Sequence, residues 1–213
     1  MIHENEVLDV VFFVAILIPS VILHEVAHGF VAKRLGDPTA HDAGRLTLNP
    51  IKHVDPFGSV LLPALLALAG QNVFGWAKPV PVNPHRFQRP VGGMAITALA
   101  GPATNLMIAL TIGRLGPFIE LDGRIFRTSD GLGTRVLIGA LVVNAALAVF
   151  NMLPIPPLDG SRLLPLFLGP GGRRLYDQAS RYGFIVLILL LFVFSGSLSF
   201  LGSLIDWVIR MAV

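Results

Sequence analysis

The sequence predicts an all-α polytopic membrane protein with about four to six transmembrane helices. Two observations predict this class. Hydrophobic residues make up 54% of the 213-residue chain and charged residues only 14%, whereas roughly 25% of residues are charged in ordinary soluble domains. Several apolar stretches also reach the length of about 20 residues that a membrane-spanning helix needs. We expect a single domain, 1–213, with a core at about 10–165 and a C-terminal helix or hairpin at 182–213.

The overall composition excludes several classes of protein. The chain has no cysteine, which rules out disulfides, thiolate zinc sites and cysteine nucleophiles. Its net charge of +3 is too small to indicate nucleic-acid binding. The first nine residues are acidic rather than basic and no small-residue cleavage site follows, so the first apolar stretch is not predicted to be a signal peptide.

Four apolar stretches are long enough to cross a bilayer as helices. They are 10–32, 90–113, 136–158 and 182–205. The last of them contains Ser195-Gly196-Ser197, which would turn it into a hairpin with the final residues. A fifth apolar run, 57–69, would be roughly 20 Å long as a helix, which is too short to cross.

Basic residues orient these helices in the membrane. The segments 33–56, 70–89 and 159–181 hold eleven of the sixteen Lys and Arg residues. By the positive-inside rule all three segments are cytoplasmic and the N-terminus lies outside. The segment 57–89 must then enter the membrane and return on the same side, as a re-entrant element with an extended return. Non-helical backbone at membrane depth is tolerated where protein or a water cavity shields it, so we expect this loop to line a functional site.

The segment HEVAH, 24–28, places ionisable side chains inside the first apolar stretch. His24 and His28 are four residues apart, so on a helix they lie on one face, one turn apart. Two such imidazoles can bind one zinc ion, and Glu25 can accept a proton from a water that the metal activates. Because polar groups at membrane depth are costly and mark functional sites, we favour a zinc site over buried histidines satisfied by their neighbours. Glu25 precedes Lys33 by eight residues, which puts the site about 12 Å inside the cytoplasmic boundary.

A third zinc ligand has to arrive on the same side of the membrane, because catalytic zinc usually has three protein ligands. Asp159 is the best candidate, since it follows the third apolar stretch at its cytoplasmic end. Prolines within 154–157 would stop the helix and Gly160 would permit a tight turn, so that Asp159 can approach the metal. Asn151 lies nearby in sequence and can donate to a developing oxyanion. The alternatives are a capping aspartate and an interhelical hydrogen bond of the asparagine.

Several motifs together resemble the site-2 protease family of intramembrane zinc metalloproteases. Three of them occur in the order of that family: HEVAH at 24–28, GPATN at 101–105 and NMLPIPPLDG at 151–160. Two further stretches, GRLTLNPIKHVDPFGS at 44–59 and FGWAKPVPVNP at 74–84, are similar to the short prokaryotic subgroup. We expect neither a PDZ nor a CBS domain, because the longest segment between spans has about forty residues.

The resemblance implies an intramembrane zinc endopeptidase in the cell membrane, with its active site near the cytoplasmic side. Its substrate would be a transmembrane protein, cut at a peptide bond in or near a membrane-spanning helix. The resemblance implies one Zn²⁺ per chain, held by His24, His28 and Asp159. It makes Glu25 the base and Asn151 a partner of the substrate carbonyl. It also implies that the GPATN residues shape the core between the ligand-bearing helices, which suits small residues and an amide. Asn105 of this motif is also a possible lining residue of the site.

Two residues of the re-entrant segment, His53 and Asp55, are possible lining residues of the site. As a pair they could hold the loop against the site or contact the metal, or belong to an ordinary surface loop. A different function is also open, namely a membrane protein that binds or transports zinc without hydrolysis. Glu25 beside the ligands favours catalysis, because a transporter needs ligands but no base.

Overall fold

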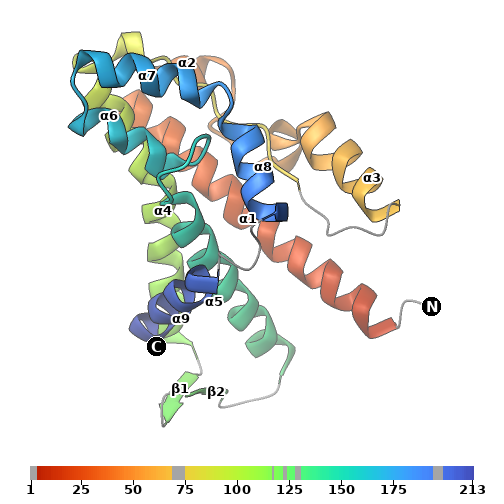
Figure 1. The fold of residues 1–213 in the computed structure, drawn as a ribbon. Helices are drawn as coiled ribbons and strands as arrows, with labels where there is room; N and C mark the ends of the chain where they lie inside the picture. The colour runs from red at the N-terminus through yellow and green to blue at the C-terminus, as the bar shows by residue number, and fades with distance from the viewer. Residues whose placement is uncertain (1–3, 69–74, 117, 122–123, 128–130, 194–198) are drawn as a thin grey trace.

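The computed structural model describes residues 4–68, 75–116, 118–121, 124–127, 131–193 and 199–213 (Figure 1). Three of the described helices are long and apolar enough to cross a membrane. They are the part Val11–Arg34 of α1 (Glu4–Arg34), α4 (Pro90–Leu115) and α5 (Leu132–Asn151). The chain is a membrane protein, and its helical bundle confirms the predicted all-α class.

The helix α4 packs against both α1 and α5. Its buried positions include Gly93, Ala98, Gly101 and Ala109. Small residues let neighbouring helix backbones approach closely, which is how helices associate where lipid removes the hydrophobic driving force. The sequence of α4 therefore brings the histidine-bearing helix α1 close to α5, whose C-terminal end leads to Asp159.

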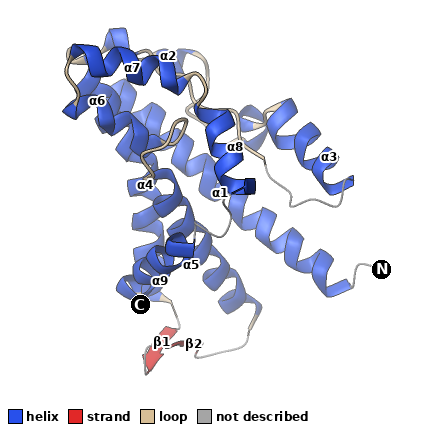
Figure 2. Ribbon diagram, in the orientation of Figure 1, coloured by secondary structure: helices blue, strands red, loops and turns tan. Residues whose placement is uncertain are grey.

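The third predicted span, 136–158, is too long, because α5 ends at Asn151. The prolines that follow lack the amide hydrogen that a helix needs, and 152–158 form an irregular loop (Figure 2). Three short helices come next: η4 (Asp159–Leu163), α6 (Leu164–Phe167) and α7 (Pro170–Ser180).

The predicted stretch 182–205 contains two separate helices, α8 (Gly183–Val193) and α9 (Ser199–Ala212). Residues 194–198, with the predicted Ser-Gly-Ser break, lie outside the described residues. The apolar side of α9 packs on α4 and α5 around Ala109, Leu141 and Val208.

The apolar run 57–69 forms two short helical segments, η2 (Pro56–Leu61, a π-helix) and α3 (Leu62–Leu68). Residues 69–74 lie outside the described residues. Residues 75–83 have no regular secondary structure, which agrees with the non-helical segment predicted there, and are called the strap below. Before and after these elements come α2 (Thr39–Asp42), η1 (Pro50–His53) and η3 (Pro84–Arg86).

A two-stranded hairpin, which the sequence did not predict, connects α4 to α5. Strand β1 (Phe118–Leu121) pairs antiparallel with β2 (Arg124–Arg127), and Phe118 lies opposite Arg127. Figure 1 shows the hairpin at one end of the bundle, and α2, α6 and α7 together at the other end. The segments that are rich in Lys and Arg thus gather at one end.

Candidate metal centre

His24 and His28 lie one turn apart on α1, and both side chains are buried. Their rings meet edge to face with centroids 4.6 Å apart. The two Nε2 atoms face each other at 3.0 Å. The helix therefore presents two imidazole nitrogens to one point in space.

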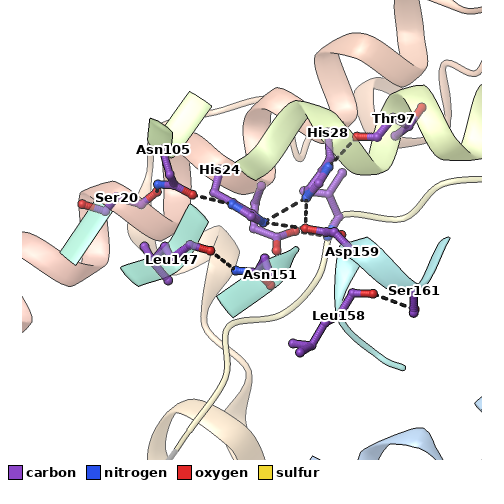
Figure 3. A network of polar contacts seen from close by, with 12 residues as sticks. Ser20, His24, His28, Thr97, Asn105, Leu147, Asn151, Leu158, Asp159 and Ser161 are labelled. Atoms are coloured by element: carbon purple, nitrogen blue, oxygen red, sulfur yellow. Dashed lines mark hydrogen bonds and ion pairs between the residues drawn. The ribbon is translucent and has the colours of Figure 1, made fainter. Parts of the chain in front are cut away.

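Asp159 brings a carboxylate to the same point from η4, as Figure 3 shows. Its Oδ2 atom lies 3.0 Å from Nε2 of His24 and 3.1 Å from Nε2 of His28. The loop after α5 returns so tightly that a side chain at Gly160 would collide with the backbone of Met152. Glycine at this position therefore permits the turn. The sequence-based placement of Asp159 beside the two histidines agrees with this geometry.

The outer nitrogens of both imidazoles already have partners. Nδ1 of His28 lies 2.7 Å from the backbone oxygen of Thr97, and Nδ1 of His24 lies 2.6 Å from Oδ1 of Asn105. A carbonyl oxygen only accepts hydrogen bonds, so each Nδ1 atom carries the hydrogen of a neutral ring. The Nε2 lone pairs of both rings then point at the carboxylate oxygen of Asp159.

Three electron-pair donors that converge in this way require a cation between them. Protons can serve if each ring also carries one on Nε2, which then donates to the carboxylate of Asp159. A metal ion serves equally well. Ligand atoms about 2.0–2.1 Å from tetrahedral zinc lie about 3.3 Å apart, close to the 3.0–3.1 Å separations here. Within the described residues, this is the group of histidines and acids that could hold a metal.

Gly101 of α4 leaves the space beside the two histidines open. A Cβ atom at this position would lie 2.5 Å from Nε2 of His24 and 2.5 Å from Nε2 of His28. Such contacts are far shorter than the 3.5–4.0 Å of ordinary packing. The two histidines, the aspartate and this opening together fit a zinc ion.

Glu25 is half-buried on α1 beside the cluster. One of its oxygens, Oε2, accepts a hydrogen bond of 2.7 Å from the backbone N–H of Val80 in the strap. The strap also donates from Lys78 N to the backbone oxygen of His53 at 2.9 Å. The guanidinium of Arg45 donates to the backbone oxygen of Lys78 at 2.7 Å. The strap thus lies beside the site through Val80 and Glu25.

Asp37 anchors the end of the strap. Its side chain is fully buried, and Oδ2 accepts a hydrogen bond of 2.6 Å from the backbone N–H of Asn83. Its Oδ1 accepts from the backbone and the hydroxyl of Thr39. Burial would raise the pKa of Asp37, but these donors together with nearby Arg86 lower it. The side chain of Asp37 is therefore ionised while it holds the strap.

Three other predicted residues have clear positions. Asn151 is the last residue of α5, and its amide nitrogen donates to the backbone oxygen of Leu147 at 3.0 Å (Figure 3). His53 is buried and donates from Nε2 to the backbone oxygen of Thr47. Asp55 accepts hydrogen bonds from the backbone at the start of η2. His53 and Asp55 are not part of the group formed by the two histidines and Asp159.

Sequence reasoning placed Asn105, the outer partner of His24, in the core between the ligand-bearing helices, but it missed the other partners of these side chains. The backbone oxygen of Thr97 has no signature in a sequence, and neither does the N–H of Val80. Asn144 on α5, which bonds to Asn105, did have a signal, since it is an amide within an apolar stretch. Such residues usually hydrogen-bond across helices.

Comparisons with known proteins agree with the motifs. Residues 126–194 match the profile of Peptidase family M50. The chain is 41% identical to YwhC of Bacillus subtilis over 197 residues, which are 92% of this chain and 84% of YwhC. It is 37% identical to Rip2 of Mycolicibacterium smegmatis over 81% of this chain and 63% of Rip2. Both relatives are provisionally named zinc metalloproteases.

A more distant relative is protease RseP of Yersinia pestis, with 26% identity over 68% of this chain and 38% of RseP. The chain therefore spans less than two thirds of Rip2 and of RseP. No solved structure gives a significant match to the chain.

Proposed function

The chain belongs to peptidase family M50, the site-2 zinc metalloproteases, and from this premise we propose that it hydrolyses a peptide bond in or near a transmembrane helix of a membrane-protein substrate. The observation that carries the proposal is the position of the cluster. His24, Glu25 and His28 lie inside the apolar helix Val11–Arg34, not in a loop. A substrate bond must come to this depth to be cut, and the bonds at this depth belong to membrane-spanning segments.

We assign one zinc ion per chain to His24, His28 and Asp159. Zinc held there would supply a Lewis acid that activates water and polarises a peptide carbonyl. Glu25 accepts a proton from the attacking water and passes it to the leaving amine. The N–H of Val80 fixes one carboxylate oxygen of Glu25, which limits the rotation of the base.

We assign to Asn151 the stabilisation of the substrate carbonyl. An amide nitrogen has two hydrogens, and the bond to the backbone of Leu147 uses one of them. The other can donate to the oxygen on which negative charge develops. Its place at the end of α5, eight residues before Asp159 in the chain, supports this role.

We place the end of the bundle that holds α2, α6 and α7 in the cytoplasm and the N-terminus outside. The gathering of the basic segments at that end supports this orientation. The short helices η2 and α3 then enter from the cytoplasmic side, and the strap returns there. With α8 and α9 also embedded, the number of helices in the membrane falls within the four to six expected.

A transmembrane substrate has to unwind locally, because helical backbone groups are bonded internally. The strap is not helical, and it lies against Glu25. We propose that the strap pairs with the unwound segment of the substrate as an added strand. This arrangement would hold the scissile bond next to the base.

The test is a paired measurement of zinc content and cleavage on purified protein in liposomes. The parent, Glu25→Gln and a control, Asp42→Asn, are assayed on a panel of single-span substrates. Asp42 is an exposed acid outside the cluster. We expect about one zinc in all three proteins and cleavage by the parent and the control only. Cleavage by Glu25→Gln would refute the assignment of the base. A zinc-loaded parent that cuts no substrate would favour a non-proteolytic metal-binding or zinc transport protein.

A further inference from the structure

A network of buried polar side chains joins α1, α4 and α5 next to the metal centre. Its members are Ser20, Asn105 and Asn144, each no more than 5% exposed. Figure 3 shows Asn105 between Ser20 and His24. Polar groups in the interior of a membrane bundle are costly unless every hydrogen bond is made. The mechanism above uses none of these three side chains directly, so their presence needs a reason.

The orientation of the Asn144 amide is fixed by a backbone group. Its Nδ2 atom lies 2.8 Å from the backbone oxygen of Ala140 and 3.0 Å from Oγ of Ser20. A carbonyl can only accept, so the NH₂ group of Asn144 must face Ala140. The hydroxyl of Ser20 donates to the backbone oxygen of Ile16 at 2.8 Å and thus accepts from Asn144. The remaining atom of the amide, Oδ1 of Asn144, points to Asn105.

The orientation of Asn105 follows from that of Asn144. Its Nδ2 atom donates to Oδ1 of Asn144 at 2.8 Å and to the backbone oxygen of Ser20 at 3.3 Å. A reversed amide would put oxygen against oxygen at both contacts. Oδ1 of Asn105 therefore faces Nδ1 of His24, at 2.6 Å. His24 must carry its hydrogen on Nδ1 and present the lone pair of Nε2 to the cluster.

The two histidines thus reach the same tautomer by different routes. His28 donates directly to the backbone oxygen of Thr97, which cannot change its role. His24 donates to a side-chain amide, which could rotate and offer NH₂ instead. Among the described residues, two contacts of Asn105 prevent this rotation: one with Asn144 and one with the backbone of Ser20.

We propose that Asn144 is a positioning residue of the metal centre, which acts through Asn105 to hold His24 in the tautomer that binds zinc. The inference rests on the metal centre of the proposed function but not on proteolysis itself. Groups behind a zinc-bound histidine orient the ring, and their loss typically lowers metal affinity about 10- to 100-fold. Asn144 acts through Asn105, and the backbone of Ser20 still contacts Asn105 when Asn144 is replaced. We therefore expect zinc affinity to fall by an amount at the lower end of that range.

The test is a double-mutant cycle with the zinc dissociation constant as the readout, measured on the full chain in detergent by competition with a chelator. Asn144→Leu should raise the constant about tenfold. In the background of Asn105→Leu, Asn144→Leu should change the zinc dissociation constant by less than about twofold, because the residue that links Asn144 to His24 is absent. Asn144→Ser is a milder second variant, because its hydroxyl can bond to the Ala140 carbonyl without reaching Asn105.

Val143→Ala is the matched control for a loss of packing in α5. Val143 is the buried neighbour of Asn144, and its truncation should lower the unfolding temperature while leaving the zinc constant within about twofold of the parent. Three results would overturn the proposal: unchanged affinity in both Asn144 variants, an equal effect with and without Asn105, or an equal effect in Val143→Ala. A parent that binds no zinc would overturn it together with the metal centre. A parent that binds zinc with the expected pattern but cuts no substrate would refute only the protease function.

Discussion

Gly101→Ala is the substitution whose effect on the metal centre follows most directly from the structure. The new Cβ atom would lie 2.5 Å from Cε1 and Nε2 of His24 and 2.5 Å from Nε2 of His28. Carbon contacts relax at about 3.5–4.0 Å, so the rings or α4 must move by about 1 Å. Zinc–ligand distances tolerate changes of only about 0.2 Å. The methyl group therefore cannot be accommodated while both histidines keep their positions.

The loss of zinc affinity in Gly101→Ala can be bounded from the free-energy cost of overpacking. Forcing one extra methyl group into a packed interior typically costs about 1–3 kcal/mol. If the zinc-bound state bears this strain, zinc affinity falls about 5- to 150-fold. The measurement is again chelator competition, accompanied by the unfolding temperature. Gly139→Ala on α5 is the control, because its Cβ atom would meet only the end of a flexible side chain, Ile16, at 2.7 Å. Parental zinc affinity in Gly101→Ala would show that the metal is not bound beside α4.

Three further predictions concern the strap and the ligands. Val80→Pro removes the N–H that holds Glu25 and should slow cleavage by about tenfold or more, with zinc content unchanged. Val82→Pro should also slow cleavage if the strap pairs with substrate. Parental cleavage rates in both variants would contradict both roles of the strap. Asp37→Asn should lower the free energy of unfolding by about 1–3 kcal/mol. Because folding lowers the pKa of Asp37 from 3.8, this loss of stability relative to the parent should be full at pH 7 and should fade as the pH falls below 3.8. Thermal unfolding of both proteins at pH 7 and pH 3 tests this. Asp159→Asn should lose zinc to a chelator that leaves the parent loaded, and equal retention by both would remove this residue from the ligand set.

The ligand cluster could be predicted from the sequence because its signals are local. Two histidines at helical spacing share a face wherever the helix lies. Asp159 stood out because acids are scarce and prolines forced the chain to turn beside it. These signals do not depend on how distant helices pack.

The remaining features depend on packing or on backbone groups. The predicted end of α5 is too late because the Met, Leu and Ile residues of 152–158 keep the stretch apolar, while its prolines end the helix. The hairpin between α4 and α5 is an exception, because its sequence does carry a signal: Asp122-Gly123 stands between the two strands, and Asp-Gly between apolar runs is typical of a two-residue hairpin turn. The partners of the histidines, the Thr97 backbone and the chain through Asn144, arise only when three helices come together.

The position of the cut bond tests the central claim most directly. A single-span substrate is incubated in liposomes with the parent protein, and the masses of both products locate the scissile bond. Glu25 lies eight residues before Lys33, so we predict a cut within the substrate's transmembrane segment, about 12 Å from its cytoplasmic end. A cut confined to a soluble loop of the substrate would contradict an active site that works at membrane depth.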